Sequence, residues 1–169
     1  SYEPYSMELK KLALEGEVFT HQKEKNILTS IRLSDILHDK FETISIDKKL
    51  GDLVEIIKRS EKNIYAVLDK KGKFAGIIEL NDIKQRLFES GQFDVVPIRA
   101  LMKKPPAVLQ EKENMHSVME KFDITQSWYL PVLDNQRKFI GFISKTRLFN
   151  KYREILASQR DLYEDFKSP

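Results

Sequence analysis

Cysteine is absent from the 169-residue sequence, and glycine, proline and tryptophan are scarce, with 6, 6 and 1 residues. The lack of cysteine excludes disulfide bonds, thiolate metal sites and a cysteine nucleophile. No apolar run approaches the roughly 18 residues of a membrane-spanning helix, and the start shows no signal-peptide pattern. The composition, 41% apolar and 33% charged, is that of an ordinary globular chain.

Patterns typical of catalytic and metal sites are also missing. His21, His38 and His116 lie far apart, and none has the i, i+4 partner or the glutamate spacing of a metal-binding helix. Neither a phosphate-binding P-loop motif nor a G-x-S-x-G nucleophile motif occurs. We therefore predict that the protein is not an enzyme and has no metal site.

Neither sign of charge predominates strongly in the sequence. There are 29 basic and 26 acidic residues, and the two signs alternate in segments such as EKEKN and KRSEK. Such mixing is typical of a solvated surface and not of a basic stripe that follows a nucleic acid. We expect no nucleic-acid partner.

One stretch of twenty residues occurs twice. NIYAVLDKKGKFAGIIELND at 63–82 matches WYLPVLDNQRKFIGFISKTR at 128–147 with an offset of 65. Asp69 then corresponds to Asp134, and Gly76 to Gly141. The match extends without a gap over more than fifty residues, so the repeat decides the architecture.

Each copy predicts a strand, an amphipathic helix, two paired strands and a second helix. Gly72 suits the positive φ of a tight turn, and Gly76 indicates a close approach to the strand backbone. A unit of about 60 residues is marginal alone. We therefore predict an α+β fold, in which two β-α-β-β-α repeats pack about a pseudo-two-fold axis. The predicted units are a leader over 1–26, a first domain over 27–91, a second domain over 92–157 and a helical extension over 158–169.

This order of elements resembles the tandem CBS domain pair, or Bateman module. The resemblance rests on YAVLD at 65–69, GIIELND at 76–82, YLPVLD at 129–134 and GFISKTR at 141–147. It covers residues 27–157, and its strength lies in the order, spacing and duplication of these strings. The resemblance implies a regulatory module that dimerises through helices.

A narrower resemblance is to the cytoplasmic tail of bacterial CLC-family voltage-gated chloride channels and transporters. It rests on four segments: YEPYSMELKKLALEGEVFTHQKEKNIL, LGDLVEIIKRSEKNIYAVLD, VVPIRALMKKPPAVLQ and GFISKTRLFNKYRE. It implies an upstream transmembrane domain in the same chain, a location at the cytoplasmic face of the inner membrane, and a homodimer that modulates ion transport. Two alternatives remain: a nucleotide-sensing accessory module of an enzyme or cation transporter, and a dimerisation module without a ligand.

The CBS resemblance also implies two clefts for adenosine-containing ligands. The family pattern has Ser or Thr three residues after the strand glycine and Asp three residues later, where the carboxylate accepts hydrogen bonds from the ribose. The first half keeps Asp82 but has Glu79, and the second half keeps Ser144 but has Arg147.

Each implied cleft combines strands of one half with the helix start of the other. The first candidate cleft contains Thr43, Ile44, Tyr65 and Ala66 with Ser144 and Arg147. The second contains Val108, Leu109, Tyr129, Leu130 and Pro131 with Glu79 and Asp82.

Purely structural roles are the alternative for these residues. Asp82 would then cap a helix, and Tyr65, Trp128 and Tyr129 would fill the core. Arg147 at a helix start opposes the helix dipole, a cost that a bound anion or a carboxylate from the other half would offset.

The expected ligand follows from the two positions, Glu79 and Arg147, at which the charge departs from the family pattern. Because Glu79 would repel phosphates, we expect adenosine or AMP in preference to ATP.

Overall fold

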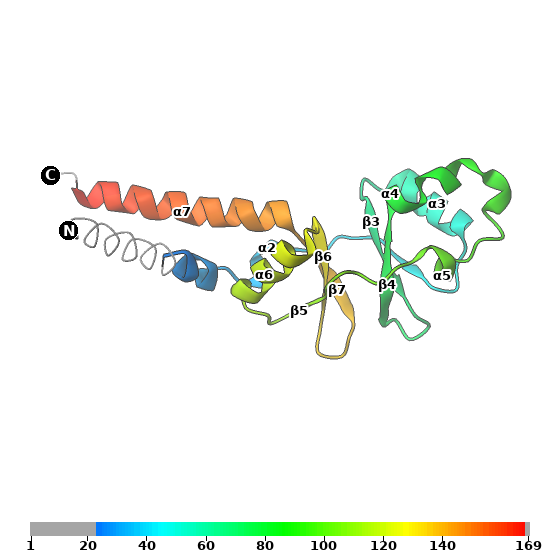
Figure 1. Cartoon of the computed structure of the whole chain (residues 1–169), viewed down its shortest axis with the longest axis horizontal. Helices are drawn as coiled ribbons and strands as arrows, with labels where there is room; N and C mark the ends of the chain where they lie inside the picture. The colour runs from blue at the N-terminus through cyan, green and yellow to red at the C-terminus, as the bar shows by residue number, and fades with distance from the viewer. Residues whose placement is uncertain (1–22, 168–169) are drawn as a thin grey trace, which may run out of the picture.

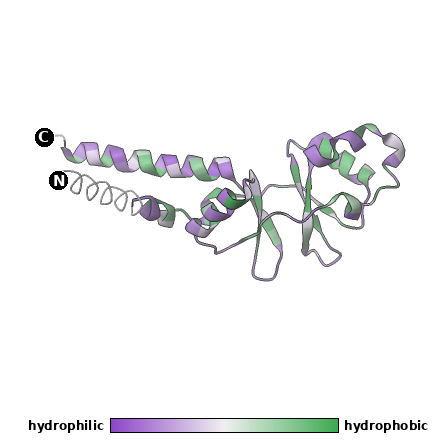
Figure 2. Ribbon diagram, in the orientation of Figure 1, coloured by the Kyte–Doolittle hydropathy of each residue, from purple (hydrophilic) through white to green (hydrophobic). Residues whose placement is uncertain are grey.

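Two small β-sheets stand side by side in the middle of the molecule, each with its helices on the outer side (Figure 1). The computed structural model describes residues 23–167. Figure 2 shows that hydrophobic residues gather on the strands, where the two sheets and their helices meet.

The first sheet has the order β2-β3-β4. Its strands are β2 (Thr43–Ser45), β3 (Ile64–Leu68) and β4 (Phe74–Glu79). β2 runs parallel to β3, and β3 forms an antiparallel hairpin with β4. Its helices are α3 (Leu50–Arg59), α4 (Leu80–Ile83) and α5 (Ile98–Leu101), with 3₁₀ turns η1 (Lys84–Phe88) and η2 (Ser90–Gln92).

The second sheet has the order β1-β7-β6-β5. Its strands are β1 (Leu37–His38), β5 (Leu109–Gln110), β6 (Tyr129–Leu133) and β7 (Phe139–Ser144). β5 runs parallel to β6, and β6 forms an antiparallel hairpin with β7. Its helices are α2 (Leu33–Ile36), α6 (Met115–Thr125), α7 (Lys145–Lys167) and a helix over 23–30.

The two hairpins repeat each other in detail. Asp69 Oδ1 accepts hydrogen bonds from the N–H groups of residues 71 and 73, at 2.8 and 2.9 Å. Asp134 Oδ1 does the same for residues 136 and 138, at 2.8 and 2.9 Å. Gly72 has φ 76°, as predicted, and Arg137 in the matching place has φ 64°. An antiparallel bridge joins Lys73 to Lys138, which places the pseudo-two-fold axis there.

The prediction of an α+β fold with two like halves is thus confirmed. The same strand order, with β5, β6 and β7 in the places of β2, β3 and β4, occurs in both. The residues of the leader up to 22 lie outside the described residues, and the predicted extension from 158 continues α7 as far as Lys167.

The two halves exchange short segments. β1 comes from the first repeat but pairs with β7, where His38 faces Phe142. Lys103 comes from the second repeat but pairs with β4, because its N–H and carbonyl both bond to Ile77 at 2.9 Å. Apolar residues before β1 accordingly lie in the core of the second half, and α5 lies in that of the first.

The repeated glycines make this exchange possible. A Cβ at Gly76 would come within 2.8 Å of the carbonyl oxygen of Lys103. A Cβ at Gly141, where φ is 153°, would collide with the carbonyl oxygen of His38. The close approach that the sequence predicted at Gly76 is therefore the backbone at Lys103 of the other repeat. We call this segment and β1, which cross to the other repeat's sheet, the crossing strands.

Between the sheets lies a third hydrophobic cluster, which joins the halves. Its buried members are Ile64, Ala66, Phe74, Ile77, Leu133 and Phe142. Phe74 and Phe139 stack with ring centroids 6.0 Å apart. Burial of these apolar side chains between the sheets stabilises both halves, as expected for units too small to fold well alone.

The final helix α7 extends away from both sheets (Figure 1). Leu148 near its start is fully buried, whereas Leu162, Tyr163 and Phe166 near its end are exposed. None of the helices within residues 23–167 combines the length and the hydropathy needed to cross a membrane.

Candidate functional site: an open cleft beside Lys103

An open cleft of about 1140 Å³ lies where the two halves meet on the side of α4. It is formed by the start of β3, the end of β4 with α4, the turn η1, the segment around Lys103, and the connection from α6 to β6. Its residues are Asn63, Ile64, Glu79, Leu80, Asn81, Lys84, Leu87, Phe88, Lys103, Lys104, Pro106, Gln126, Ser127, Trp128 and Tyr129.

Aromatic rings are exposed on two walls of this cleft. Trp128, just before β6, is 68% exposed, and Tyr129 is 37% exposed. Phe88 in η1 is 83% exposed. The predicted role of Trp128 as core filling is therefore wrong, whereas Tyr129, although partly exposed, packs against Phe41 and Phe142. Exposed rings that line a concavity offer a stacking surface to a flat ligand.

Lys103 holds the two carboxylates of the cleft together. Its Nζ lies 3.0 Å from Glu79 Oε2 and 2.6 Å from Asp82 Oδ2. The hydrogen bond to Asp82 is the main cause that raises the pKa of Lys103, although partial burial opposes it. Lys103 therefore stays charged at neutral pH and neutralises part of the acidic charge.

Asp82 is not a helix cap. The N-cap of α4 is Glu79, without a side-chain cap bond, and Asp82 lies in the first turn. The helix-cap role predicted for Asp82 is thus wrong, and its carboxylate pairs with Lys103 instead. Sequence reasoning missed Lys103, since only the exchange of strands brings it beside residues 79 and 82.

Further positive charge lies around the same cleft. Lys84 and Lys104 are exposed and have no ion pair among residues 23–167. Lys145 Nζ lies 5.6 Å from the ring centroid of Trp128. Lysines with paired carboxylates leave a net positive potential, which favours an anionic ligand.

The other residues predicted for this cleft lie behind its wall. Leu109 and Leu130 are fully buried in the core of the second half, and Pro131 is buried in β6. Val108 packs against the cluster between the sheets. None of these four residues lines the cleft, and the side chains of Leu109 and Leu130 face the core.

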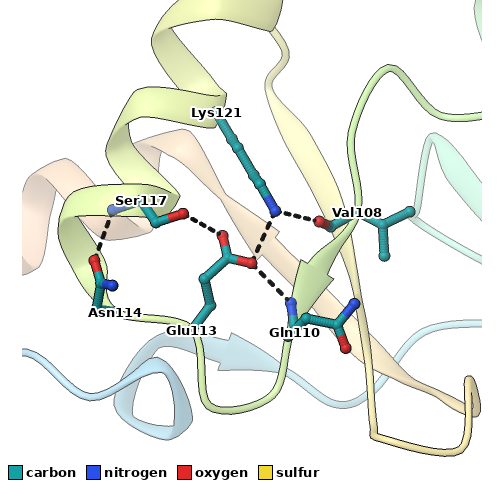
Figure 3. A network of polar contacts seen from close by, with 6 residues as sticks. All are labelled: Val108, Gln110, Glu113, Asn114, Ser117 and Lys121. Carbon is teal, nitrogen blue, oxygen red and sulfur yellow. Dashed lines mark hydrogen bonds and ion pairs between the residues drawn. The ribbon is translucent and has the colours of Figure 1, made fainter.

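A polar network fixes the backbone beside Val108 (Figure 3). Lys121 Nζ donates to the Val108 carbonyl and pairs with Glu113 Oε1, both at 2.8 Å. Glu113, only 10% exposed, also accepts hydrogen bonds from the Gln110 N–H at 3.2 Å and the Ser117 hydroxyl at 3.1 Å. Charge-assisted bonds at low exposure are strong, so the network holds the chain between β5 and α6 in place.

In the other repeat, Ser144 and Arg147 stand at the positions of Glu79 and Asp82, and they have different polar contacts. His38 Nε2 lies 3.2 Å from Ser144 Oγ, and the Arg147 N–H donates to the same oxygen at 3.0 Å. The Arg147 guanidinium donates to the Leu37 carbonyl at 3.2 Å. Arg147 is thus partnered by a backbone carbonyl of the first repeat, where the sequence predicted a bound anion or a carboxylate.

Aromatic side chains occupy this second region. The Phe41 ring lies 4.5 Å from that of Phe142, 5.8 Å from His38 and 6.1 Å from Tyr129. Lys62 Nζ lies 4.8 Å from the centroid of Phe41. These rings pack where the sequence predicted a ligand beside Ser144.

The remaining residues predicted for this region are divided between surface and core. Thr43 is exposed, while Ile44 and Tyr65 lie in the core of the first half. The Tyr65 hydroxyl donates to the Lys62 carbonyl at 2.7 Å, so its core role is confirmed. Ala66 lies in the cluster between the sheets.

Within residues 23–167, no three His, Asp or Glu side chains cluster closely enough to hold a metal ion.

Comparisons with known proteins identify the repeat. The CBS domain family matches twice, over residues 33–89 and 98–154. A homoserine O-acetyltransferase of Methanosarcina acetivorans is 26% identical over 132 residues, which cover 76% of this chain and 24% of that enzyme. The same-named protein of Methanosphaera stadtmanae is 23% identical over 129 residues, 76% of this chain and 26% of its own. The chain thus spans about a quarter of these curated relatives.

Solved structures show the same fold. The structure described as CbpB in complex with c-di-AMP matches with a TM-score of 0.68 at 17% identity, covering 84% of this chain and 97% of the other. Staphylococcus aureus OpuCA matches with a TM-score of 0.60 at 20% identity, covering 72% and 98%. With two family matches over most of its length, the chain belongs to the CBS domain family and forms a tandem CBS pair.

Proposed function

We propose that this CBS pair is a regulatory module that binds an adenine nucleotide in the open cleft and performs no catalysis itself. The observation that carries the proposal is the arrangement of Trp128 and Tyr129 beside Lys84 and Lys104 in one cleft. A flat base stacks on exposed rings, and lysines attract phosphate. The related structure of CbpB was determined with c-di-AMP, which has the same two chemical features.

The mechanism that we propose is conformational. The cleft contains residues of both repeats, so a ligand there binds more tightly to one relative arrangement of the halves than to another. That difference is a coupling free energy, which any attached domain can use. The polar network of Glu113 and Lys121 then keeps the chain between β5 and α6 in place while the halves adjust.

The accessory-module alternative has more support than the channel-tail interpretation. The curated relatives named above are enzymes of which this chain spans a quarter, and none of the proteins named above is a chloride channel. An upstream transmembrane domain stays a prediction from the sequence. So does a homodimer, for which the exposed Leu162, Tyr163 and Phe166 of α7 offer an apolar surface.

The expected preference against ATP needs revision in this proposal. That preference rested in part on an unpaired carboxylate at Glu79, but Lys103 pairs with it at 3.0 Å. The repulsion expected between Glu79 and phosphates is therefore reduced in this cleft. AMP, ADP and ATP are all proposed ligands.

Trp128 is the only tryptophan in the chain, so its fluorescence reports the cleft directly. Titration of the 169-residue chain with AMP, ADP or ATP is expected to change this emission saturably, with one ligand per chain. In calorimetry, Trp128→Ala is expected to weaken AMP binding about tenfold, because stacking of one base contributes roughly 1–3 kcal/mol.

A matched control is Ile124→Ala, which removes an exposed apolar side chain of α6 that does not line the cleft. Its affinity is expected to equal that of the wild type. Absence of saturable binding by all three nucleotides at millimolar concentration would refute the proposal.

A further inference from the structure

The geometry points to Lys103 as the residue that makes the cleft prefer phosphorylated nucleotides over the neutral nucleoside. This inference rests on the proposed function, since it concerns the charge selectivity of the same cleft. Lys103 acts as an internal counterion: it neutralises two carboxylates that would otherwise face an incoming phosphate.

The charges at the cleft depend strongly on this one side chain. Glu79 lines the cleft, and Asp82 lies just behind it. Without Lys103, these two carboxylates would oppose Lys84 and Lys104, leaving little net field. With Lys103, the lysines outnumber the carboxylates, and both acidic groups already have a close partner. The cleft then attracts a phosphate group, whereas the affinity for uncharged adenosine does not depend on the net charge of the cleft.

The backbone of Lys103 is held in place. Its N–H and its carbonyl each form a 2.9 Å hydrogen bond with Ile77 on β4. The missing side chain of Gly76 lets the strand approach this closely. Because the crossing strand is anchored on β4, the ammonium group stays within reach of the β4 end, where Glu79 lies.

Protonation supports the same role. The pKa of Lys103 is raised, chiefly by its hydrogen bond to Asp82 and further by Glu79. The counterion is therefore present throughout the neutral pH range, and the selectivity needs no change of pH.

The test compares AMP with adenosine, measured by calorimetry and by Trp128 emission on the 169-residue chain. In the wild type, AMP is expected to bind at least tenfold more tightly than adenosine. In Lys103→Met, this ratio is expected to fall about tenfold, mainly through weaker AMP binding, as one lost charge interaction at short range implies. Lys112→Met is the matched control, since Lys112 is an exposed lysine outside the cleft.

A rescue variant separates charge from structure. Glu79→Gln combined with Lys103→Met removes one of the two carboxylates that Lys103 neutralised and restores the net charge of the wild-type cleft, so the preference for AMP is expected to return. Thermal denaturation checks that all variants fold, which the partial exposure of Lys103 favours.

Two outcomes overturn the inference in different ways. If AMP binds but Lys103→Met keeps the wild-type ratio, the inference fails while the proposed function stands. If neither AMP nor adenosine binds the wild type, both fail together. A lowered ratio that the double variant does not restore assigns the effect to displaced structure and also overturns the charge role.

Discussion

The two clefts of this CBS pair occupy matching places in the repeats, yet one is open and the other is filled. In the open cleft, Lys103 of the crossing strand meets the carboxylates of Glu79 and Asp82. In the filled one, His38 of the other crossing strand meets Ser144, whose neighbour Arg147 bonds to a backbone carbonyl. The same backbone exchange therefore supports two different chemistries.

Side-chain size explains why only one cleft is open. At positions separated by 65 residues, the filled cleft has an aromatic ring where the open cleft has a smaller side chain. Phe41 corresponds to Pro106 and Tyr129 to Ile64, both of which line the open cleft, and Phe142 corresponds to Ile77, which is buried between the sheets. Tyr129 lies between the two regions and also lines the open cleft. Three rings pack on one another in this second region. A repeat can thus keep its fold while one site is lost to packing.

The largest effect is expected where each crossing strand touches its glycine. Gly141→Ala should destabilise the fold by about 2–4 kcal/mol, because the new Cβ meets the His38 carbonyl in a strained backbone conformation. Gly76→Ala should cost about 1–3 kcal/mol, since its Cβ comes within 2.8 Å of the Lys103 carbonyl. Urea denaturation gives both values.

Gly91→Ala is the matched control for these two variants. A Cβ there meets nothing within 4 Å, and the free energy of unfolding should stay within about 0.5 kcal/mol of the wild type. Equal stability of all three variants would show that the crossing strands do not press on β4 and β7.

A smaller effect is expected from emptying the filled cleft. Phe41→Ala removes a partly buried ring that contacts Phe142 and Tyr129, so we expect a loss of about 2 kcal/mol in unfolding free energy. Space beside Ser144 should then admit a second AMP, raising the calorimetric stoichiometry from one toward two.

Phe166→Ala, an exposed ring at the far end of α7, is the control and should change neither quantity. A wild-type stoichiometry of two would contradict the contrast between the clefts.

The smallest effect concerns pH. Burial, followed by the charges of Arg147 and Lys62, lowers the pKa of His38, and Asp39 opposes this. The unfolded chain, with a His pKa of about 6.5, then binds a proton more readily than the folded one. Stability should therefore fall as the pH drops from about 7.5 through 6.5 toward the folded pKa.

Urea midpoints measured across this range test the expectation. His38→Gln should flatten the pH dependence, while His116→Gln, at an exposed site on α6, should leave it unchanged. A steeper slope in His38→Gln would mean that another group controls the transition.

Local features were readable from the sequence because nearby residues determine them. The hairpins, the turn at Gly72 and the helices α3 and α6 follow from periodicity and turn chemistry. The resemblance to CBS pairs also predicted the pairing of Glu79 and Tyr129 in one cleft, and the structure brings both to its lining. Whether they bind a ligand stays a prediction.

The exposure of aromatic residues was not readable in the same way. Tyr65 is buried, whereas Trp128 in a similar apolar context is largely exposed. A strand of alternating residues does not reveal which of its faces meets another sheet and which meets a cleft. The packing of the two halves decides which face is buried and which is exposed.

The sequence by itself determined that this protein consists of two like α+β units, because a 65-residue offset repeats both the strand pattern and the turn residues. Only the tertiary structure decided which cleft is open, and that Lys103 is its counterion. The physical reason is distance along the chain. β1 and the strand at Lys103 are too short to show a period, and each pairs with the other repeat. Their contacts arise when the halves pack together, so no local pattern records them.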